Sequence, residues 1–154
     1  MKLWGITNTG LVRSENQDAY AAFEAGGCTA AVVCDGMGGT HGGRVASAIA
    51  VACFQREIQN DLRADMTADQ LRHVMLAAIA AANDAIRREA GRNADYRHMG
   101  PTLVCALARP DMAAPTISPR RASARSPATT RWWRAWWPRA TSRLRRPAAI
   151  PTAT

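Results

Sequence analysis

The sequence predicts an α+β fold over residues 1–110, followed by a tail that forms no packed unit. Short apolar runs typical of strands flank two long stretches with helical periodicity. The composition then changes abruptly near residue 110. Residues 1–110 hold eleven Lys and Arg against eleven Asp and Glu, so the net charge of +8 lies entirely in residues 111–154. That tail is rich in Arg, Ala, Pro, Ser, Thr and Trp, and we expect it to be disordered.

Four short runs predict strands. Residues 3–9 are rich in Trp, Ile and Thr, and residues 18–23 read DAYAAF. Residues 28–34 form a continuous apolar run between glycines and Asp35-Gly36, which is typical of a strand buried on both faces. Residues 102–107 predict the last strand, followed by a turn at Arg109-Pro110-Asp111. The strands therefore provide a sheet for the helices to cover.

Two helices are predicted between these strands. The first runs over residues 44–64, after residues 36–43, where five glycines in eight positions predict a loop. The second begins after Thr67, with Gln70 completing a capping box, and stops near Gly91. Each has one apolar face, formed by Ile49, Cys53, Phe54, Ile58 and Leu62 in the first and by Leu71, Val74, Met75, Ala78, Ile79, Ala82 and Ile86 in the second.

The four cysteines, Cys28, Cys34, Cys53 and Cys105, lie in apolar segments without C-x-x-C or zinc spacing. They are expected to be buried free thiols in a reducing compartment. Neither a secretory signal nor a membrane-spanning run is evident, so the expected location is the cytoplasm.

Four residues could perform chemistry together. Asp35 and Gly36 close a predicted strand, where a carboxylate and a carbonyl can approach one divalent cation. Asp18 heads the neighbouring strand, and Arg13 offers donors that fit a phosphate. Taken singly, an Asp-Gly is usually a turn, and the glycine-rich run lacks the G-K-[ST] of a nucleotide loop. Together they indicate metal-assisted chemistry on a phosphoryl group.

Taken in order, these residues resemble a known family. The segments that carry the resemblance are Gly10-Leu11-Val12-Arg13, Asn16-Gln17-Asp18, Val33-Cys34-Asp35-Gly36-Met37-Gly38-Gly39, Gly43, Ala46-Ser47 and His98-Met99-Gly100-Pro101-Thr102-Leu103-Val104. Their order and spacing resemble the bacterial branch of the metal-dependent (PPM, type 2C) protein serine/threonine phosphatases. The resemblance covers residues 1–110 and implies the N-terminal half of an α-β-β-α sandwich, with antiparallel strands and two long antiparallel helices.

The resemblance also implies roles. Asp35 would bridge two Mn²⁺ or Mg²⁺ ions, Gly36 would ligate one through its carbonyl, and Asp18 would bind metal directly or through water. Arg13 would hold the substrate phosphate, so Arg13, Asp18 and Asp35 are the expected catalytic residues. The implied partners are phosphoserine and phosphothreonine proteins, and the bacterial likeness adds a cognate serine/threonine kinase in signalling.

The sequence also departs from the family pattern. Arg44 stands where a Glu is common, His41 lies one place late, and Pro101 replaces a Thr. The later family blocks are missing: Gly-Asp-Ser-Arg, a second Asp-Gly and a closing Asp-Asn. We therefore expect a truncated domain with weak or no turnover. Our hypothesis for residues 111–154 is translation of GC-rich DNA out of frame.

Two alternatives stay open at this point. A non-catalytic module could bind through the cationic, Trp-containing tail, although nucleic acid is an unfavoured partner because the tail has no repeated motif. A pseudo-phosphatase could bind phosphoprotein through Arg13 without turnover.

Overall fold

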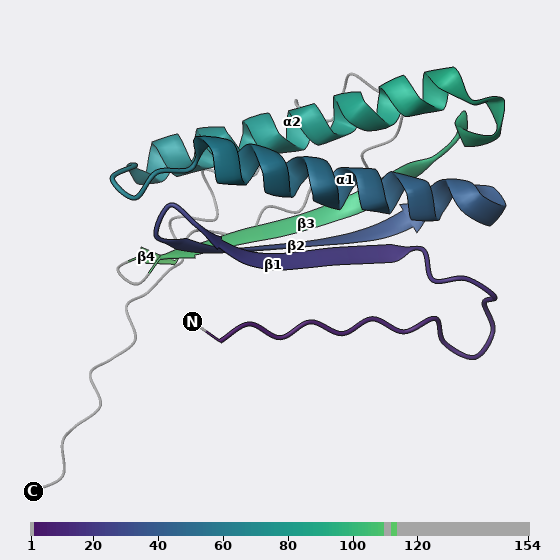
Figure 1. Cartoon of the computed structure of the whole chain (residues 1–154), viewed down its shortest axis with the longest axis horizontal. Helices are drawn as coiled ribbons and strands as arrows, with labels where there is room; N and C mark the ends of the chain where they lie inside the picture. Colours follow the sequence, from purple (N-terminus) through teal and green to yellow (C-terminus); the bar gives the residue numbers. More distant parts are fainter. Residues whose placement is uncertain (1, 110–111, 114–154) are drawn as a thin grey trace, which may run out of the picture.

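The computed structural model describes residues 2–109 and 112–113 and consists of a sheet with helices on one face (Figure 1). The elements are β1 (Asp18–Ala25), β2 (Cys28–Met37), α1 (Gly39–Asp61), α2 (Ala68–Arg92), a 3₁₀ turn η1 (Ala94–Tyr96), β3 (Gly100–Arg109) and β4 (Met112–Ala113). The strand order is β1-β2-β3-β4, and every neighbouring pair is antiparallel. Two helices and an antiparallel sheet confirm the expected α+β class.

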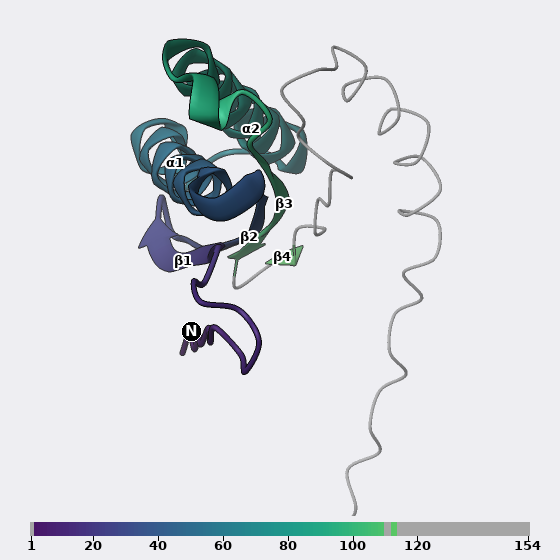
Figure 2. The ribbon, with the colours of Figure 1, turned by 90° about the vertical axis from the view of Figure 1, so that its right-hand side faces the viewer.

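The hydrophobic core lies between the sheet and the helices. Figure 2, which looks along the layers, shows α1 and α2 on the same side of β1, β2 and β3. Phe54 and Ile58 of α1 are buried, as is Leu62 just after the helix, and Leu71 and Met75 of α2 face the same core. Apolar residues recur every three or four positions because one side of each helix must cover apolar strand residues. The apolar periodicity of the sequence therefore identified correctly which side of each helix packs against the sheet.

Helix α1 starts earlier than predicted. It begins at Gly39, so Gly42 and Gly43 lie in its first turns, and Gly36 belongs to β2. The predicted loop over residues 36–43 and helix start at residue 44 were therefore wrong. Gly42 and Gly43 are buried, and a Cβ on Gly42 would come within 3.2 Å of Met99 Cβ. The glycines allow close packing at the start of the helix, which outweighs their unfavourable helix propensity.

The start of α2 agrees with the capping-box prediction. Thr67 is the N-cap, and its Oγ1 accepts from the Gln70 backbone N–H at 3.3 Å. The Gln70 Oε1 accepts from the Thr67 backbone N–H at 2.8 Å in return. Two N–H groups that have no partner within the helix are thus satisfied by local side chains. No helix of the described residues is long and apolar enough to cross a membrane.

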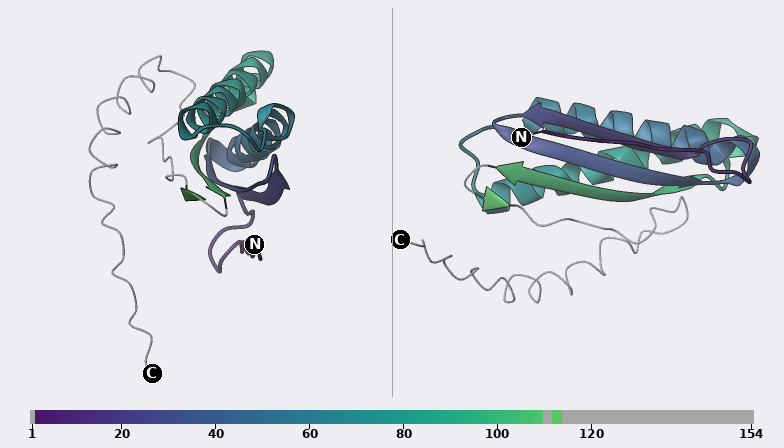
Figure 3. Two further views of the ribbon diagram at one scale, coloured as in Figure 1. Left: turned by 90° about the vertical axis from the view of Figure 1, so that its left-hand side faces the viewer. Right: turned by 90° about the horizontal axis from the view of Figure 1, so that it is seen from below.

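Strand β2 is buried on one face only, so the prediction of burial on both faces was wrong. Its residues alternate between buried positions such as Val32 and open positions such as Val33, which is 55% exposed. Both helices lie on one side, and Figure 3 shows the strands uncovered by helices when viewed from the other side. We call this uncovered side the open face. A run of small and β-branched residues could not distinguish one-sided from two-sided burial.

The segment 2–9 forms no strand, which corrects a second prediction. It lies on the open-face side of β1, where it lines a hollow of about 290 Å³ together with Tyr20 and Val33 (Figures 1 and 2). Trp4 and Ile6 are 91% and 92% exposed. Within the described residues this segment has no strand neighbour, and a strand requires one to satisfy its backbone. The β-forming composition of this segment was therefore not sufficient to predict a strand.

The sheet also extends slightly past the boundary expected from composition. β4 pairs with β3 through Arg109↔Met112 and Ala108↔Ala113. The expected disorder of the tail concerns mainly residues 114–154, which lie outside the described residues.

The layer arrangement predicts unequal effects of substitutions on the two faces. Phe54→Ala removes a fully buried ring and should lower the free energy of unfolding by about 3–5 kcal/mol. Val33→Thr on the open face should change it by no more than about 0.5 kcal/mol. Urea unfolding followed by circular dichroism measures both. Equal losses in the two variants would contradict the one-sided core.

Candidate metal and phosphate site

Two carboxylates and a hydroxyl form one row across the open face. Asp18 of β1 is the direct cross-strand partner of Asp35 of β2, and Asp35 is the partner of Thr102 of β3. Directly opposed residues share one face, with Cβ atoms about 4.5–5.5 Å apart. Both carboxylates are exposed, and the Asp35 N–H donates to the Thr102 Oγ1 at 3.3 Å. The sheet therefore brings together the two aspartates that the sequence singled out.

The next row of the open face is apolar. Tyr20, Val33 and Val104 stand opposite one another in adjacent strands. They are 40%, 55% and 38% exposed, respectively. The carboxylate row therefore has apolar neighbours on one side. No basic residue stands opposite either aspartate in the strand pairing.

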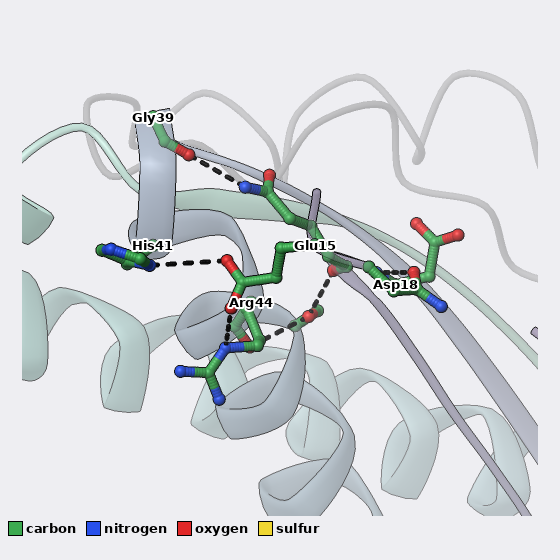
Figure 4. Close-up of polar contacts among 8 residues, drawn as sticks. Glu15, Asp18, Gly39, His41 and Arg44 are labelled. Atoms are coloured by element: carbon green, nitrogen blue, oxygen red, sulfur yellow. Dashed lines mark hydrogen bonds and ion pairs between the residues drawn. The ribbon is translucent and has the colours of Figure 1, made fainter. Parts of the chain in front are cut away.

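The loop before β1 is held in place by the backbone carbonyl of Gln17. This oxygen accepts from the Gly36 N–H at 3.1 Å and from the Ser47 hydroxyl at 2.6 Å. The Gln17 side chain donates from Nε2 to the Gly39 carbonyl at 2.9 Å (Figure 4). Residue 17 thus connects the loop to the end of β2 and to the first turns of α1. Asp18, the next residue, is positioned by the same connections.

Glycine is required where β2 meets α1. A Cβ on Gly36 would overlap the carbonyl oxygen of Gly43, and a Cβ on Gly43 would come within 2.8 Å of the Gly36 carbonyl oxygen. The strand end and helix start therefore touch through their backbones. The Gly36 carbonyl lies at this junction, next to the carboxylate row.

Arg13 lies in the loop ahead of β1 and shares a hollow with Asp35. The hollow has a volume of about 480 Å³ and is lined by Val12, Arg13, Ser14, Glu15, Gln17, Asp35, Gly36 and Met37. Arg13 is exposed, and its guanidinium offers donors to a ligand in the hollow. Asp18 lines the neighbouring hollow beside segment 2–9. Arg13 and Asp35 can therefore contact one bound anion and its counterion.

Sequence reasoning missed a group of charged residues beside this hollow. Glu15 accepts from Arg44 Nε at 2.6 Å, and its other oxygen lies 3.5 Å from His41 Nδ1. In Figure 4 the Asp18 carboxylate points away from this group. Arg44 and His41 had been noticed only as departures from a family pattern. Glu15, two residues after Arg13, gave no signal of its own in the sequence.

The cysteines take no part in the site. All four are buried and none forms a disulfide, as the sequence predicted. Burial raises the pKa of the Cys34 thiol to about 12, and burial with the nearby Cys34 raises that of Cys105 to about 12. These thiols stay protonated near neutral pH and are poor metal ligands.

The donor set fits part of a divalent cation site. Asp18 and Asp35 supply hard oxygen ligands, which Mg²⁺ and Mn²⁺ prefer. Within the described residues, no group of three or more His, Cys, Asp or Glu is close enough to form a complete site. Two opposed carboxylates repel each other, so a cation between them would relieve that repulsion.

Repulsion between the Asp18 and Asp35 carboxylates predicts that the row lowers the free energy of unfolding. In EDTA at neutral pH, Asp35→Asn should raise the free energy of unfolding by about 0.2–1 kcal/mol. Asp65→Asn, at an exposed position in the connection between α1 and α2, is the matched control and should leave it nearly unchanged. Thermal and urea unfolding provide the measurement. A clear loss of stability in Asp35→Asn would argue against the repulsion.

The backbone contact between β2 and α1 predicts a severe effect of one methyl group. Gly36→Ala should destabilise the fold by about 2 kcal/mol or more, because the added Cβ overlaps Gly43. Gly91→Ala, where a Cβ meets nothing within 4 Å, should stabilise α2 by about 0.5–1 kcal/mol. The two variants are compared by thermal unfolding. A harmless Gly36→Ala would show that the junction is looser than described.

Comparison with known proteins agrees with this geometry. A 2C-type protein phosphatase of Streptococcus pyogenes serotype M6 is 33% identical over 105 residues, covering 67% of this chain and 41% of that protein. The solved structure of the serine/threonine phosphatase Stp1 from Staphylococcus aureus matches with a TM-score of 0.57 and 32% identity, over 68% of this chain and 41% of that one.

The Streptococcus agalactiae serine/threonine phosphatase matches with a TM-score of 0.55 and 30% identity, over 69% of this chain and 43% of that one. The chain thus spans less than half the length of these relatives. The family model described as protein phosphatase 2C matches residues 12–116, which include the carboxylate row, Arg13 and both helices. This chain therefore belongs to the protein phosphatase 2C family.

Proposed function

We propose that this chain carries part of the active site of a metal-dependent protein serine/threonine phosphatase that hydrolyses phosphoserine and phosphothreonine. The observation that carries the proposal is the pairing of Asp18 with Asp35 on one row, next to the hollow that Arg13 shares with Asp35. Family membership supports the same reaction class. The two solved relatives named above are serine/threonine phosphatases, and the activity is transferred from them to this chain as a proposal.

The cation would be held by the carboxylate row. Asp18 and Asp35 are the proposed ligands, for Mn²⁺ or Mg²⁺, and the Gly36 carbonyl is a third. When bound, such cations supply Lewis-acid activation of water and neutralise phosphoryl charge.

Arg13 would hold the substrate phosphate. Its guanidinium can bind two phosphate oxygens through parallel N–H donors. A phosphate without a cation would be repelled by Asp18 and Asp35, so substrate binding should require the metal. Arg13 thus orients the phosphate in the hollow, and the aspartates keep the cation against it.

The partners follow from this chemistry. Phosphoserine and phosphothreonine proteins are the proposed substrates, which makes a serine/threonine kinase the source of the phosphate. Cytoplasmic signalling is the setting in which we place the reaction. The proposed turnover of the chain alone is weak, because the described residues provide only two carboxylates for the cation.

The proposal predicts a metal dependence that two aspartates control. Mn²⁺ should raise the thermal midpoint of the unaltered chain and of Asp65→Asn, but not of Asp18→Asn or Asp35→Asn. Hydrolysis of an aryl phosphate, measured with enzyme in excess to detect slow turnover, should require Mn²⁺. It should fall at least about tenfold in Asp35→Asn and in Arg13→Gln.

The Asp65→Asn control distinguishes a loss of activity at the proposed site from a contaminating phosphatase and from unfolding of the variant. Asp65→Asn should retain both the Mn²⁺ shift and the hydrolysis. Hydrolysis that persists unchanged in Asp35→Asn, or absence of both metal stabilisation and hydrolysis in the unaltered chain, would refute the proposed function.

A further inference from the structure

Helix α1 lacks its own stabilisation at the N-terminus. Its N-cap, Gly38, makes no side-chain capping bond, and its first turn contains no acidic residue. The first turns do contain the imidazole of His41 and the guanidinium of Arg44, and the guanidinium adds positive charge to the positive end of the helix dipole. A negative charge from elsewhere would relieve this local excess.

Glu15 supplies that charge from the loop before β1. Its Oε1 accepts from Arg44 Nε at 2.6 Å. Its Oε2 is buried and has no hydrogen-bond partner, with His41 Nδ1 3.5 Å away. The Glu15 side chain is 29% exposed and the Arg44 side chain is 58% exposed, so water partly screens the pair and its strength is that of a surface ion pair.

The position of Glu15 in the chain gives this ion pair a consequence for the site. Glu15 lies two residues after Arg13, and both line the same hollow. The Gln17 connections fix the far end of the loop, but the only bridge from residue 15 to α1 that the structure shows among the described residues is this charged group. Arg44 also neutralises a carboxylate that would otherwise oppose an anion in the hollow.

We propose that Glu15 is a positioning residue for phosphate. Its ion pair with Arg44 holds the loop of residues 10–17 on the first turns of α1 and thereby keeps Arg13 over the hollow. The loop-fixing part depends only on the structure. The phosphate part rests on the proposed function.

A double-mutant cycle on the full chain tests the loop-fixing part. The variants are Glu15→Gln, Arg44→Gln and the two together, with Glu57→Gln as the control because Glu57 forms an ion pair with Arg56 elsewhere on α1. Trypsin cleavage after Arg13 is followed by mass spectrometry, with cleavage after Arg63 in the α1–α2 connection as internal reference. Peptides of residues 8–20, with and without the Glu15→Gln change, correct for its effect on the protease itself.

Each single variant should speed cleavage after Arg13 by about two- to fivefold, and the double variant should be no faster than the singles. Glu57→Gln should behave like the unaltered chain. Effects that add in the double variant, or no acceleration in either single variant, would overturn the proposal. Thermal unfolding checks that every variant remains folded.

The second readout is protection of Arg13 by inorganic phosphate with Mn²⁺ present. The phosphate concentration giving half-protection should rise about two- to fivefold in Glu15→Gln and Arg44→Gln and stay constant in Glu57→Gln. A shift in cleavage rate without a shift in this concentration would overturn the role in phosphate binding. Failure of phosphate to protect even the unaltered chain would count against the proposed function, while the cleavage cycle would still decide whether Glu15 holds the loop.

Discussion

The contact between the end of β2 and the start of α1 is the constraint on which the rest of the site depends. Gly36 and Gly43 meet there without side chains, and the Gln17 carbonyl joins them by accepting from Gly36 and Ser47. A side chain at either glycine would separate the strand from the helix. Because Gln17 also precedes β1, one small junction determines where the strand with Asp35, the strand with Asp18 and the loop with Arg13 lie relative to one another.

The two faces of the sheet have different roles. The covered face packs against the helices, with Leu107 of β3 in the same core as Phe54 of α1 and Met75 of α2, and this packing provides the stability. The open face carries the carboxylate row, which costs stability through repulsion. A rigid sheet with a packed back can hold like charges close together, because strand pairing prevents the two aspartates from moving apart. This arrangement is typical of functional sites, which depart from the most stable choice of residues.

Charge around the hollow follows a consistent pattern. In the proposed site, Asp18 and Asp35 bind a cation and Arg13 binds an anion, and a Glu15 carboxylate without an ion pair would repel that anion. The structure places Glu15 in an ion pair with Arg44 instead. The carboxylate thus acts on the first turns of α1, where the helix dipole and the Arg44 guanidinium favour it. Arg44, which seemed an isolated departure when the sequence was compared with a family pattern, has a partner in the loop.

Signals between residues close together in the chain predicted much of the local structure and the identity of the chemical groups. Apolar periodicity and the capping box of Thr67 and Gln70 identified both helices, and the order of Arg13, Asp18, Asp35 and Gly36 indicated phosphate and metal chemistry. These signals are readable because they depend on residues close together in the chain. The early start of α1 and the one-sided burial of β2 could not be predicted from these local signals. Both were set by the packing of segments distant in sequence, as were the Asp18–Asp35 register, the Gln17 junction and the Glu15–Arg44 pair, and such packing cannot be inferred from local patterns.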